Sequence, residues 1–361
     1  MDFQSLHDKN VAVLQDQVKL WHAKKTCEET LSLAAGTHQS NTTIKKKYKN
    51  TKSKINLSSF SHILEVDVQK KIAIVEPKVT MEQLVKKVLE YNLLVPVIPE
   101  FKGITVGGAI MGAAGESSSF KYGLFNDICN SYEVLLGDGT IVRASKDENS
   151  DLFYGIAGSY GSIGTILKAE IQLIEAPAAI KVRYIPFDDV KKALSYLTKR
   201  CQNSKELEYL DGIAFSDTFA IVMEGSFLHS DALVPKNAFC DLSAINSDWF
   251  YQHVAKKTES EECFLVYDYL FRYDQGAFWM GSYLFKYKFL LRFLIEGLCN
   301  ISKQNAFSSF NKDEISQFEK IHTQSSFFKR LVGSYLSSER LYGMLHKNEK
   351  WVETKCIIQD F

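Results

Sequence analysis

The chain has 361 residues, more than one ordinary hydrophobic core contains, and this length favours two domains. Hydrophobic residues make up 45% of it and charged residues 24%, which excludes a disordered chain and is typical of a globular protein. The 43 basic and 43 acidic residues cancel, so there is no net positive field to attract a polyanion, and we expect no nucleic-acid partner.

The cysteines and histidines do not follow any pattern of a metal or disulfide framework. There are 7 cysteines, an odd number without a CxxC pair, and the 8 histidines include no HxxxH pair. We therefore predict no metal. A GxSxG motif is also absent, which argues against serine hydrolysis.

The start of the chain lacks the basic and apolar pattern of a secretory signal. The most apolar long stretch, residues 277–298, is interrupted by Lys286, Lys288 and Arg292 and is a weak membrane-span candidate. We expect a reduced, cytoplasmic protein. For residues 264–298 two interpretations stay open, peripheral membrane contact and ordinary core burial.

The first half of the chain alternates between short helices and strands. A capping box, Thr80 with Gln83, predicts the start of one helix, and Asp138-Gly139 predicts the turn of a hairpin over 132–144. Asn149 precedes a further helix, which we expect Ser150 or Asp151 to cap. The remaining predictions are a helix over 11–23, β structure over 31–35, 55–67, 71–77, 95–99 and 167–174, and a break at Pro177.

Three stretches rich in Gly, Ser and Thr stand out, namely 36–42, 103–119 and 158–166. Such turns expose several backbone N–H groups at once and can hold an anion. The middle stretch has neither a GxGxxG motif nor a GK[ST] motif. An ordinary turn, or a small-residue helix packed on a sheet, explains any one of them. Three in one chain favour a long phosphate-bearing cofactor, and with no visible acid–base constellation they favour redox chemistry.

After Pro177 glycine becomes rarer and aromatic residues more frequent. We expect strands over 181–184 and 220–223, with a helix over 188–197 between them. The sequence thus predicts two domains, 1–177 and 178–361. The second domain supplies either an apolar pocket or simply an aromatic core.

Several motifs together resemble a known family. They run from Thr105 to Ile174 as TVGG, ESSS, KYG, NSDLFY and GSxGxxG. This combination resembles the flavin domain of the vanillyl-alcohol oxidase and p-cresol methylhydroxylase (PCMH) superfamily, and within it the delta-24-sterol reductases. The resemblance covers nearly the whole chain and is strongest over 55–175.

The resemblance implies an α+β fold, in which a two-subdomain PCMH-type FAD-binding domain precedes an incomplete α+β substrate (cap) domain. FAD would bind in an extended pose between the three Gly-rich stretches. The cofactor-binding residues that it implies are Gly36, Thr37, His38, Gln39, Ser40, Thr105, Val106, Gly107, Gly108, Ala109, Ile110, Met111, Gly112, Ala113, Ala114, Gly115, Glu116, Ser117, Ser118, Tyr122, Gly123, Gly158, Ser159, Gly161, Gly164, Thr165 and Ile166.

The activity that the resemblance implies is reduction of a carbon–carbon double bond in the side chain of a sterol, with electrons passing from NADPH through FAD. The second domain would then provide an apolar trough for the sterol-like substrate. Two alternatives stay open: an FAD-dependent oxidase or dehydrogenase of an alcohol or hydroxy acid, and a truncated, non-catalytic flavin- or sterol-binding protein. No residue is assigned as the catalytic acid.

The chain departs from the family pattern in three places. Gln39 stands where covalent flavoproteins carry the attaching histidine, so we expect non-covalent FAD with His38 beside it. Animal sterol reductases carry an N-terminal membrane span, and because this chain starts too late for one, we expect none in it. The chain ends at Phe361, where relatives continue, so we expect a truncated substrate domain, and a partner could supply the missing segment. Finally, Gly107→Val or Gly108→Val should abolish FAD retention, because a branched side chain would fill the phosphate space.

Overall fold

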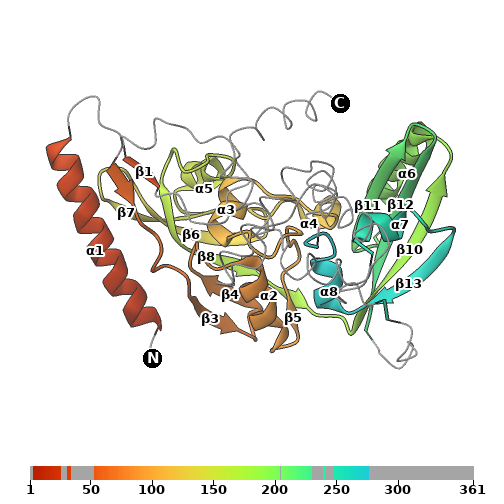
Figure 1. The fold of residues 1–361 in the computed structure, drawn as a ribbon. Coiled ribbons are helices and arrows are strands. Elements are labelled where there is room, and N and C mark those ends of the chain that lie inside the picture. Colours follow the sequence, from red (N-terminus) through yellow and green to blue (C-terminus); the bar gives the residue numbers. More distant parts are fainter. Residues whose placement is uncertain are drawn as a thin grey trace, which may run out of the picture.

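The structure is a computed structural model that describes residues 3–25, 31–33, 53–203, 205–229, 239–240 and 248–275. Helices combine with two main antiparallel sheets, one in each half of the described residues (Figure 1), which confirms the α+β fold class. The predicted turn at Gly36–Ser40 lies outside the described residues.

The first sheet has five strands in the order β3-β4-β8-β6-β7, and every neighbouring pair is antiparallel. The predicted hairpin is confirmed as β6 and β7, with Leu135 opposite Ile141. Gly139 has a φ of 89° at its turn, a conformation that glycine adopts without strain. The strands are β3 (Ile63–Asp67), β4 (Ile72–Val75), β6 (Cys129–Leu135), β7 (Ile141–Ser145) and β8 (Thr165–Gln172).

Helix α2 (Met81–Leu89) forms as its sequence predicts. The Thr80 side chain accepts a hydrogen bond from the Gln83 N–H, and the Gln83 side chain accepts one from the Thr80 N–H. This capping box satisfies two N–H groups that the first helical turn leaves without partners. Leu84, Val85 and Val88 are fully buried, so one face of α2 packs into the core.

Two local predictions in this half are wrong. Residues 95–99 are buried but pair with no strand among the described residues; instead β5 (Leu93–Leu94) pairs with β9 (Ile174–Glu175). Pro96 and Pro99 have no N–H to donate to a ladder, which explains the absence of pairing. The N-cap of α5 (Ser150–Ile156) is Asn149, in the left-handed region with a φ of 49°, and its side chain donates to the Arg143 carbonyl rather than capping the helix.

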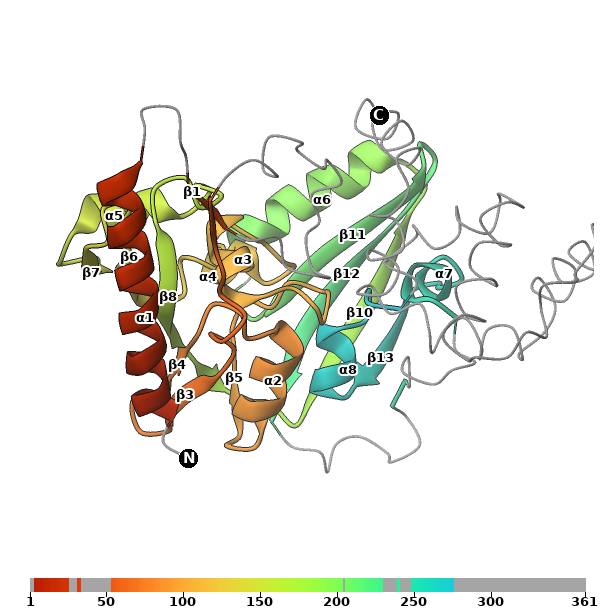
Figure 2. The same cartoon turned by 60° about the vertical axis from the view of Figure 1, so that its left-hand side comes forward.

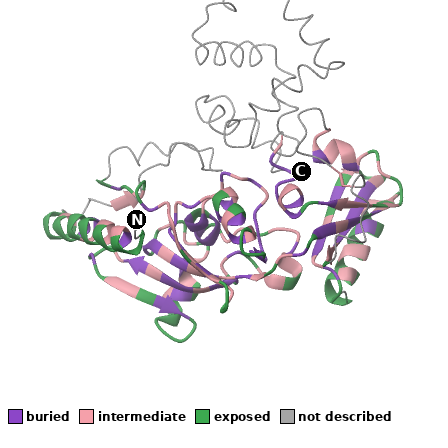
Figure 3. Ribbon diagram, turned by 90° about the horizontal axis from the view of Figure 1, so that it is seen from below, coloured by how far each residue is buried: buried purple, intermediate pink, exposed green. Residues whose placement is uncertain are grey.

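The first helix, α1 (Phe3–Lys24), is longer than predicted and largely exposed (Figure 3). It contacts the sheet through a small apolar cluster that includes Leu14 and Val18. Its first turns are held by His7, whose side chain is 1% exposed and lies 2.7 Å from Glu76 and 3.3 Å from Glu133. After α1, β1 (Leu31–Leu33) pairs in parallel with β2 (Ser53–Ile55), so the predicted β run 55–67 divides into β2 and β3.

The second sheet begins at Ala179 and has the order β11-β12-β10-β13, again antiparallel throughout. Helix α6 (Val190–Asn203) lies along β11 and β12 (Figure 2). Aromatic side chains fill the core of this half, and Tyr184, Tyr209 and Phe264 are at most 2% exposed. The strands are β10 (Ala179–Phe187), β11 (Tyr209–Ser216), β12 (Phe219–Leu228) and β13 (Ser260–Phe264). Helix α7 (Phe250–Val254) lies between β12 and β13 in the chain, and helix α8 (Val266–Leu270) follows β13.

His7→Ala should destabilise the protein by about 3 kcal/mol, because it leaves a buried carboxylate short of its partner. Burial lowers the pKa of His7, but the hydrogen bonds to Glu133 and Glu76 raise it by more than burial lowers it. The pKa of His7 is therefore above its ordinary value of 6.5. The contribution of His7 to the stability of the folded protein is therefore fully present below pH 6.5. It is lost as the pH rises through the pKa that His7 has in the folded state.

Chemical unfolding at a series of pH values measures this effect. The control is His22→Ala, an exposed position on the same helix that should change stability by less than about 0.5 kcal/mol. Equal stability of His7→Ala and wild type at pH 6 would contradict the assignment.

Candidate functional site

The middle Gly-rich stretch forms a six-residue helix, α3 (Val106–Met111), closed at both ends by its own residues. At its start the Thr105 side chain accepts a hydrogen bond from the Gly108 N–H. At its end the Ala114 N–H bonds to the Ala109 carbonyl, and Ala113 adopts a φ of 47°. Left-handed residues commonly end helices in this way, although glycine is usual there.

The inner face of α3 belongs to the hydrophobic core, where Val106, Ala109 and Ile110 are at most 1% exposed. Gly107 lies on this face as well, and its N–H donates to the Pro77 carbonyl at 2.9 Å. A Cβ at Gly107 would approach the Pro77 Cβ to 2.7 Å. Close packing on Pro77 therefore already excludes a side chain at Gly107, without any role of a cofactor.

The outer face of α3 and the segment after it carry the exposed glycines, Gly108, Gly112 and Gly115. A Cβ at Gly108 would meet no atom closer than 3.1 Å, the Thr105 Oγ1. The predicted stretch therefore divides into a packing face and a face of exposed backbone. Exposed backbone of this kind is what a large ligand can approach closely.

The third Gly-rich stretch lies against the end of α3. The Tyr160 N–H donates to the Met111 carbonyl at 3.3 Å. Gly158 and Gly161 have φ values of 71° and 78°, and a Cβ at Gly158 would meet nothing within 4 Å. At the other end of this stretch Gly164, Thr165 and Ile166 are buried where β8 begins. Large exposed apolar side chains lie on and near this stretch: Tyr160 is 75% exposed, Tyr154 64% and Ile163 47%.

Two serine hydroxyls beside these loops are buried without a partner. They are the Oγ atoms of Ser118 and Ser159, two of four such side-chain atoms among the described residues. A buried hydroxyl without a hydrogen bond costs free energy, so each such group requires an explanation. Both serines belong to the Gly-rich stretches, and a polar ligand would give each hydroxyl the partner that it lacks, so these residues fit a polar cofactor.

The serine-rich segment also contacts the second half of the protein. The Ser117 carbonyl accepts a hydrogen bond from the Leu210 N–H at 2.9 Å, which joins it to β11. In the following helix, α4 (Ser119–Tyr122), the Tyr122 hydroxyl donates to Glu208 at 2.6 Å. Gly123 then has a φ of 79°, and a Cβ there would collide with Asp127.

Sequence reasoning missed the charged residue that joins these parts, Arg272. Its guanidinium is 1% exposed and lies 2.8 Å from Glu116 and 3.3 Å from Asp211. It also stacks over the Tyr269 ring at 4.2 Å. Burial lowers the pKa of Arg272, but the surrounding tyrosines and carboxylates raise it more, so the guanidinium stays charged. The contact joins residues 156 positions apart, and no local pattern in the sequence points to it.

A second carboxyl near Glu116 behaves differently. Burial, together with repulsion from Glu116, raises the pKa of Glu100 to about 8, and Arg272 offsets this only in part. At neutral pH Glu100 therefore holds its proton.

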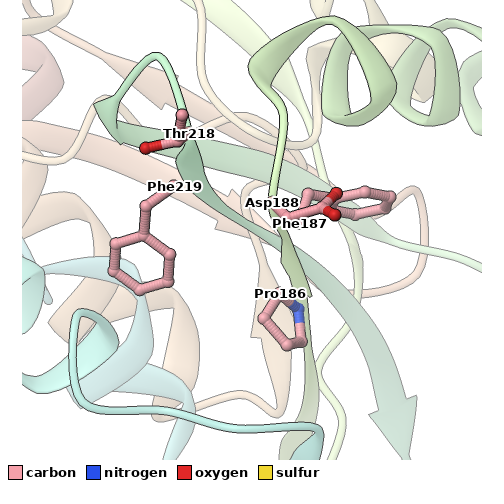
Figure 4. A pocket seen from close by; sticks show the side chains of 5 residues that line it. All are labelled: Pro186, Phe187, Asp188, Thr218 and Phe219. Atoms are coloured by element: carbon pink, nitrogen blue, oxygen red, sulfur yellow. The ribbon is translucent and has the colours of Figure 1, made fainter.

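A separate pocket of about 420 Å³ lies on the second sheet, where β10 ends and β12 begins (Figure 4). None of its lining residues belongs to the predicted site. Three of them are apolar, and the complete lining consists of Pro186, Phe187, Asp188, Thr218 and Phe219.

Comparison with known proteins agrees with this geometry. Residues 14–145 match the FAD binding domain family. Over this range the chain is similar to an FAD binding domain. This range contains α3 and the serine-rich segment, whereas the third Gly-rich stretch lies beyond it.

Among its relatives, the protein is 36% identical over 290 residues to Delta(24)-sterol reductase of Homo sapiens, which covers 76% of this chain and 53% of the relative. It is 33% identical to Delta(24)-sterol reductase of Arabidopsis thaliana, over 67% of this chain and 45% of the relative. A shorter match, 29% identical over 36% of this chain and 22% of the relative, joins it to cytokinin dehydrogenase 1 of Arabidopsis thaliana. The chain thus spans about half the length of the sterol reductases it matches.

No helix within the described ranges is both long enough and apolar enough to cross a membrane.

Gly107→Ala should lower the melting temperature, because its Cβ would collide with Pro77. We expect a loss of about 1–3 kcal/mol. Gly108→Ala, its exposed neighbour in the same helix, is the control and should be tolerated, since alanine also favours helix. Thermal unfolding of both variants without added FAD separates the two positions. Equal melting temperatures would contradict the packing role of Gly107.

Glu100→Gln should change how stability depends on pH. The unfolded chain loses this proton above its ordinary pKa of 4.5, whereas the folded protein keeps it up to about pH 8. Wild-type stability therefore falls across this window, and the variant lacks that fall. The advantage of Glu100→Gln should grow from pH 5 to pH 8 in chemical unfolding. Glu65→Gln, an exposed carboxylate on β3, serves as the control. An advantage that does not change with pH would refute this prediction.

Proposed function

We propose that the protein is an FAD-dependent oxidoreductase that reduces a C=C bond of a sterol-like substrate with electrons from NADPH. The observation that carries the flavin part is the pair of unpartnered hydroxyls, Ser118 and Ser159, beside exposed glycine backbone. The match of residues 14–145 to an FAD binding domain supports the same cofactor.

In this proposal FAD is non-covalent and lies in an extended pose over the outer face of α3. Exposed backbone at Gly108, Gly112 and Gly115 would face the pyrophosphate, and the Gly158–Ile166 stretch would line the adenosine-to-ribityl part. The turn at Gly36–Ser40, where Gln39 replaces an attaching histidine, would meet the cofactor from the other side. When bound, FAD supplies the hydride chemistry.

The protein's own residues would hold and orient the reactants. We assign 1–177 to the FAD-binding domain and 178–361 to the substrate domain, because the second sheet begins at Ala179. The substrate domain would fix the alkene over the flavin and keep water away. The sterol-like substrate rests on the names of the relatives in Homo sapiens and Arabidopsis thaliana, and the chain spans only about half of their length.

The alternative within the same family is an FAD-dependent oxidase or dehydrogenase of an alcohol or hydroxy acid. The match to cytokinin dehydrogenase 1 favours keeping it, since that relative is named as a different kind of oxidoreductase. A non-catalytic flavin- or sterol-binding protein is the second alternative. In that case a partner would supply the remaining part of the substrate domain.

The visible absorption spectrum of the purified protein, before and after anaerobic NADPH, separates these functions. Flavin bands that bleach with NADPH support the reductase and lead to a sterol turnover assay. Bands that NADPH leaves unchanged, but that bleach with an alcohol or hydroxy acid, indicate the oxidase or dehydrogenase. Flavin that no reductant of these classes bleaches indicates a binding protein. A colourless protein that takes up no added FAD refutes the proposal.

Ser118→Ala should weaken FAD binding about tenfold, the effect of losing one hydrogen bond of about 1.4 kcal/mol. The FAD-free protein should lose no stability, because this hydroxyl has no protein partner. Titration with FAD and thermal unfolding of the FAD-free variant measure the two effects.

Ser119→Ala is the matched control for this prediction. The Ser119 hydroxyl accepts a hydrogen bond from the Glu116 N–H at 2.9 Å, so its loss should cost the FAD-free protein about 1 kcal/mol. If Ser118→Ala bound FAD as wild type does, the hydroxyl would not serve the cofactor.

A further inference from the structure

The second sheet holds a cluster of potential metal ligands far from the glycine loops in sequence. The Sγ of Cys240, a ring nitrogen of His253 and a carboxylate oxygen of Glu262 all lie within 4.8 Å of one another. They come from three places. Cys240 follows Phe239, which forms a bridge with β13; His253 lies in helix α7, and Glu262 lies in β13 itself. Spacings of 13 and 9 residues match no familiar metal motif, which is why the sequence predicted no metal.

The distances within this cluster are close to those of a tetrahedral zinc site. Ideal Zn–N and Zn–S bonds of about 2.0–2.1 and 2.3 Å place two ligand atoms about 3.4–3.6 Å apart. Cys240 Sγ lies 3.7 Å from His253 Nε2, which already fits. His253 Nε2 lies 2.8 Å from Glu262 Oε2, so this pair must open by roughly half an ångström.

The arrangement does not suit a catalytic thiol. A Cys–His–carboxylate triad uses opposite nitrogens of the imidazole, one for the thiol and one for the carboxylate. Here the same nitrogen, His253 Nε2, faces both Cys240 and Glu262. Three ligand atoms that converge on one point are instead what a metal ion requires.

The carboxylate is already oriented for one metal bond. Lys257 pairs with Oε1 of Glu262, which leaves Oε2 to face His253. The Tyr184 hydroxyl donates to the same Oε2 at 3.0 Å. Ligating carboxylates in metal sites are commonly held by such outer hydrogen bonds.

The backbone of the cysteine is also fixed. The Cys240 N–H donates to the Cys263 carbonyl at 2.9 Å, and Phe239 forms a bridge with Cys263. These two contacts fix the backbone of Cys240 beside β13. All three ligand residues keep partial exposure, so an ion can reach them.

We propose that Cys240, His253 and Glu262 bind a divalent metal ion of the zinc class, with water in the fourth position. A thiolate and a carboxylate together neutralise the charge of the ion. Soft sulfur with imidazole nitrogen selects zinc over magnesium or calcium. The bound ion joins residues 239–240 to α7 and β13.

The test is zinc titration of the full-length protein after chelator treatment, by calorimetry and native mass spectrometry. Wild type is expected to bind one zinc ion. The variants Cys240→Ser and His253→Ala are each expected to bind zinc with an affinity at least about 100-fold lower. Tyr184→Phe removes only an outer hydrogen bond and is expected to weaken binding about 10-fold. Cys263→Ser, the neighbouring cysteine on β13, is the matched control and retains wild-type affinity.

Thermal unfolding guards against variants that fail to fold. Zinc is expected to raise the melting temperature of wild type and of Cys263→Ser, but not of Cys240→Ser, because only a ligand bound to the folded state stabilises it. Wild type that binds no zinc at about 10 µM, or Cys240→Ser that binds it as tightly as wild type, overturns the proposal. Neither result depends on flavin, so the zinc site and the proposed function are tested independently of each other.

Discussion

The position of the serine-rich segment depends on one buried charge, the guanidinium of Arg272. A charged group out of water must be matched by opposite charge and by hydrogen bonds, or the fold loses several kcal/mol. Glu116 provides the match from the segment after α3, and Asp211 provides it from β11. Because these two carboxylates come from different halves of the protein, satisfying Arg272 also fixes Ser117 and its neighbours against the second sheet.

This arrangement has an electrostatic consequence for Glu100. One guanidinium compensates Glu116 and Asp211 at close range, and little positive charge remains for a third carboxylate nearby. Glu100 therefore stays protonated at neutral pH, since ionisation would place it beside Glu116 without a partner of its own. The contacts of Arg272 that hold the serine-rich segment in place thus also favour the protonated form of Glu100 near Glu116.

Local chemistry made part of this fold predictable from the sequence. The capping box at Thr80 and the turn at Asp138-Gly139 depend on residues within a few positions of each other, and both formed as expected. The predictions that were wrong concern residues whose structure depends on partners elsewhere in the chain. Residues 95–99 are extended and apolar but find no strand to pair with in the part of the chain that the structure describes, and the Asn149 side chain bonds to the Arg143 carbonyl instead of the helix. The Arg272 contacts and the Cys240, His253 and Glu262 cluster exist only after the protein has folded.

The glycines of α3 explain why one motif can carry both fold and function. Gly107 lacks a side chain because Pro77 occupies the space, a constraint that would hold in a protein with no ligand. Gly108, one position along and about 100° around the helix, is exposed, and a Cβ there would meet only the Thr105 Oγ1, at 3.1 Å. A small-residue helix can thus pack its inner face on the core while its outer face stays bare. The sequence records both demands as the same residue type, and only the structure separates the two.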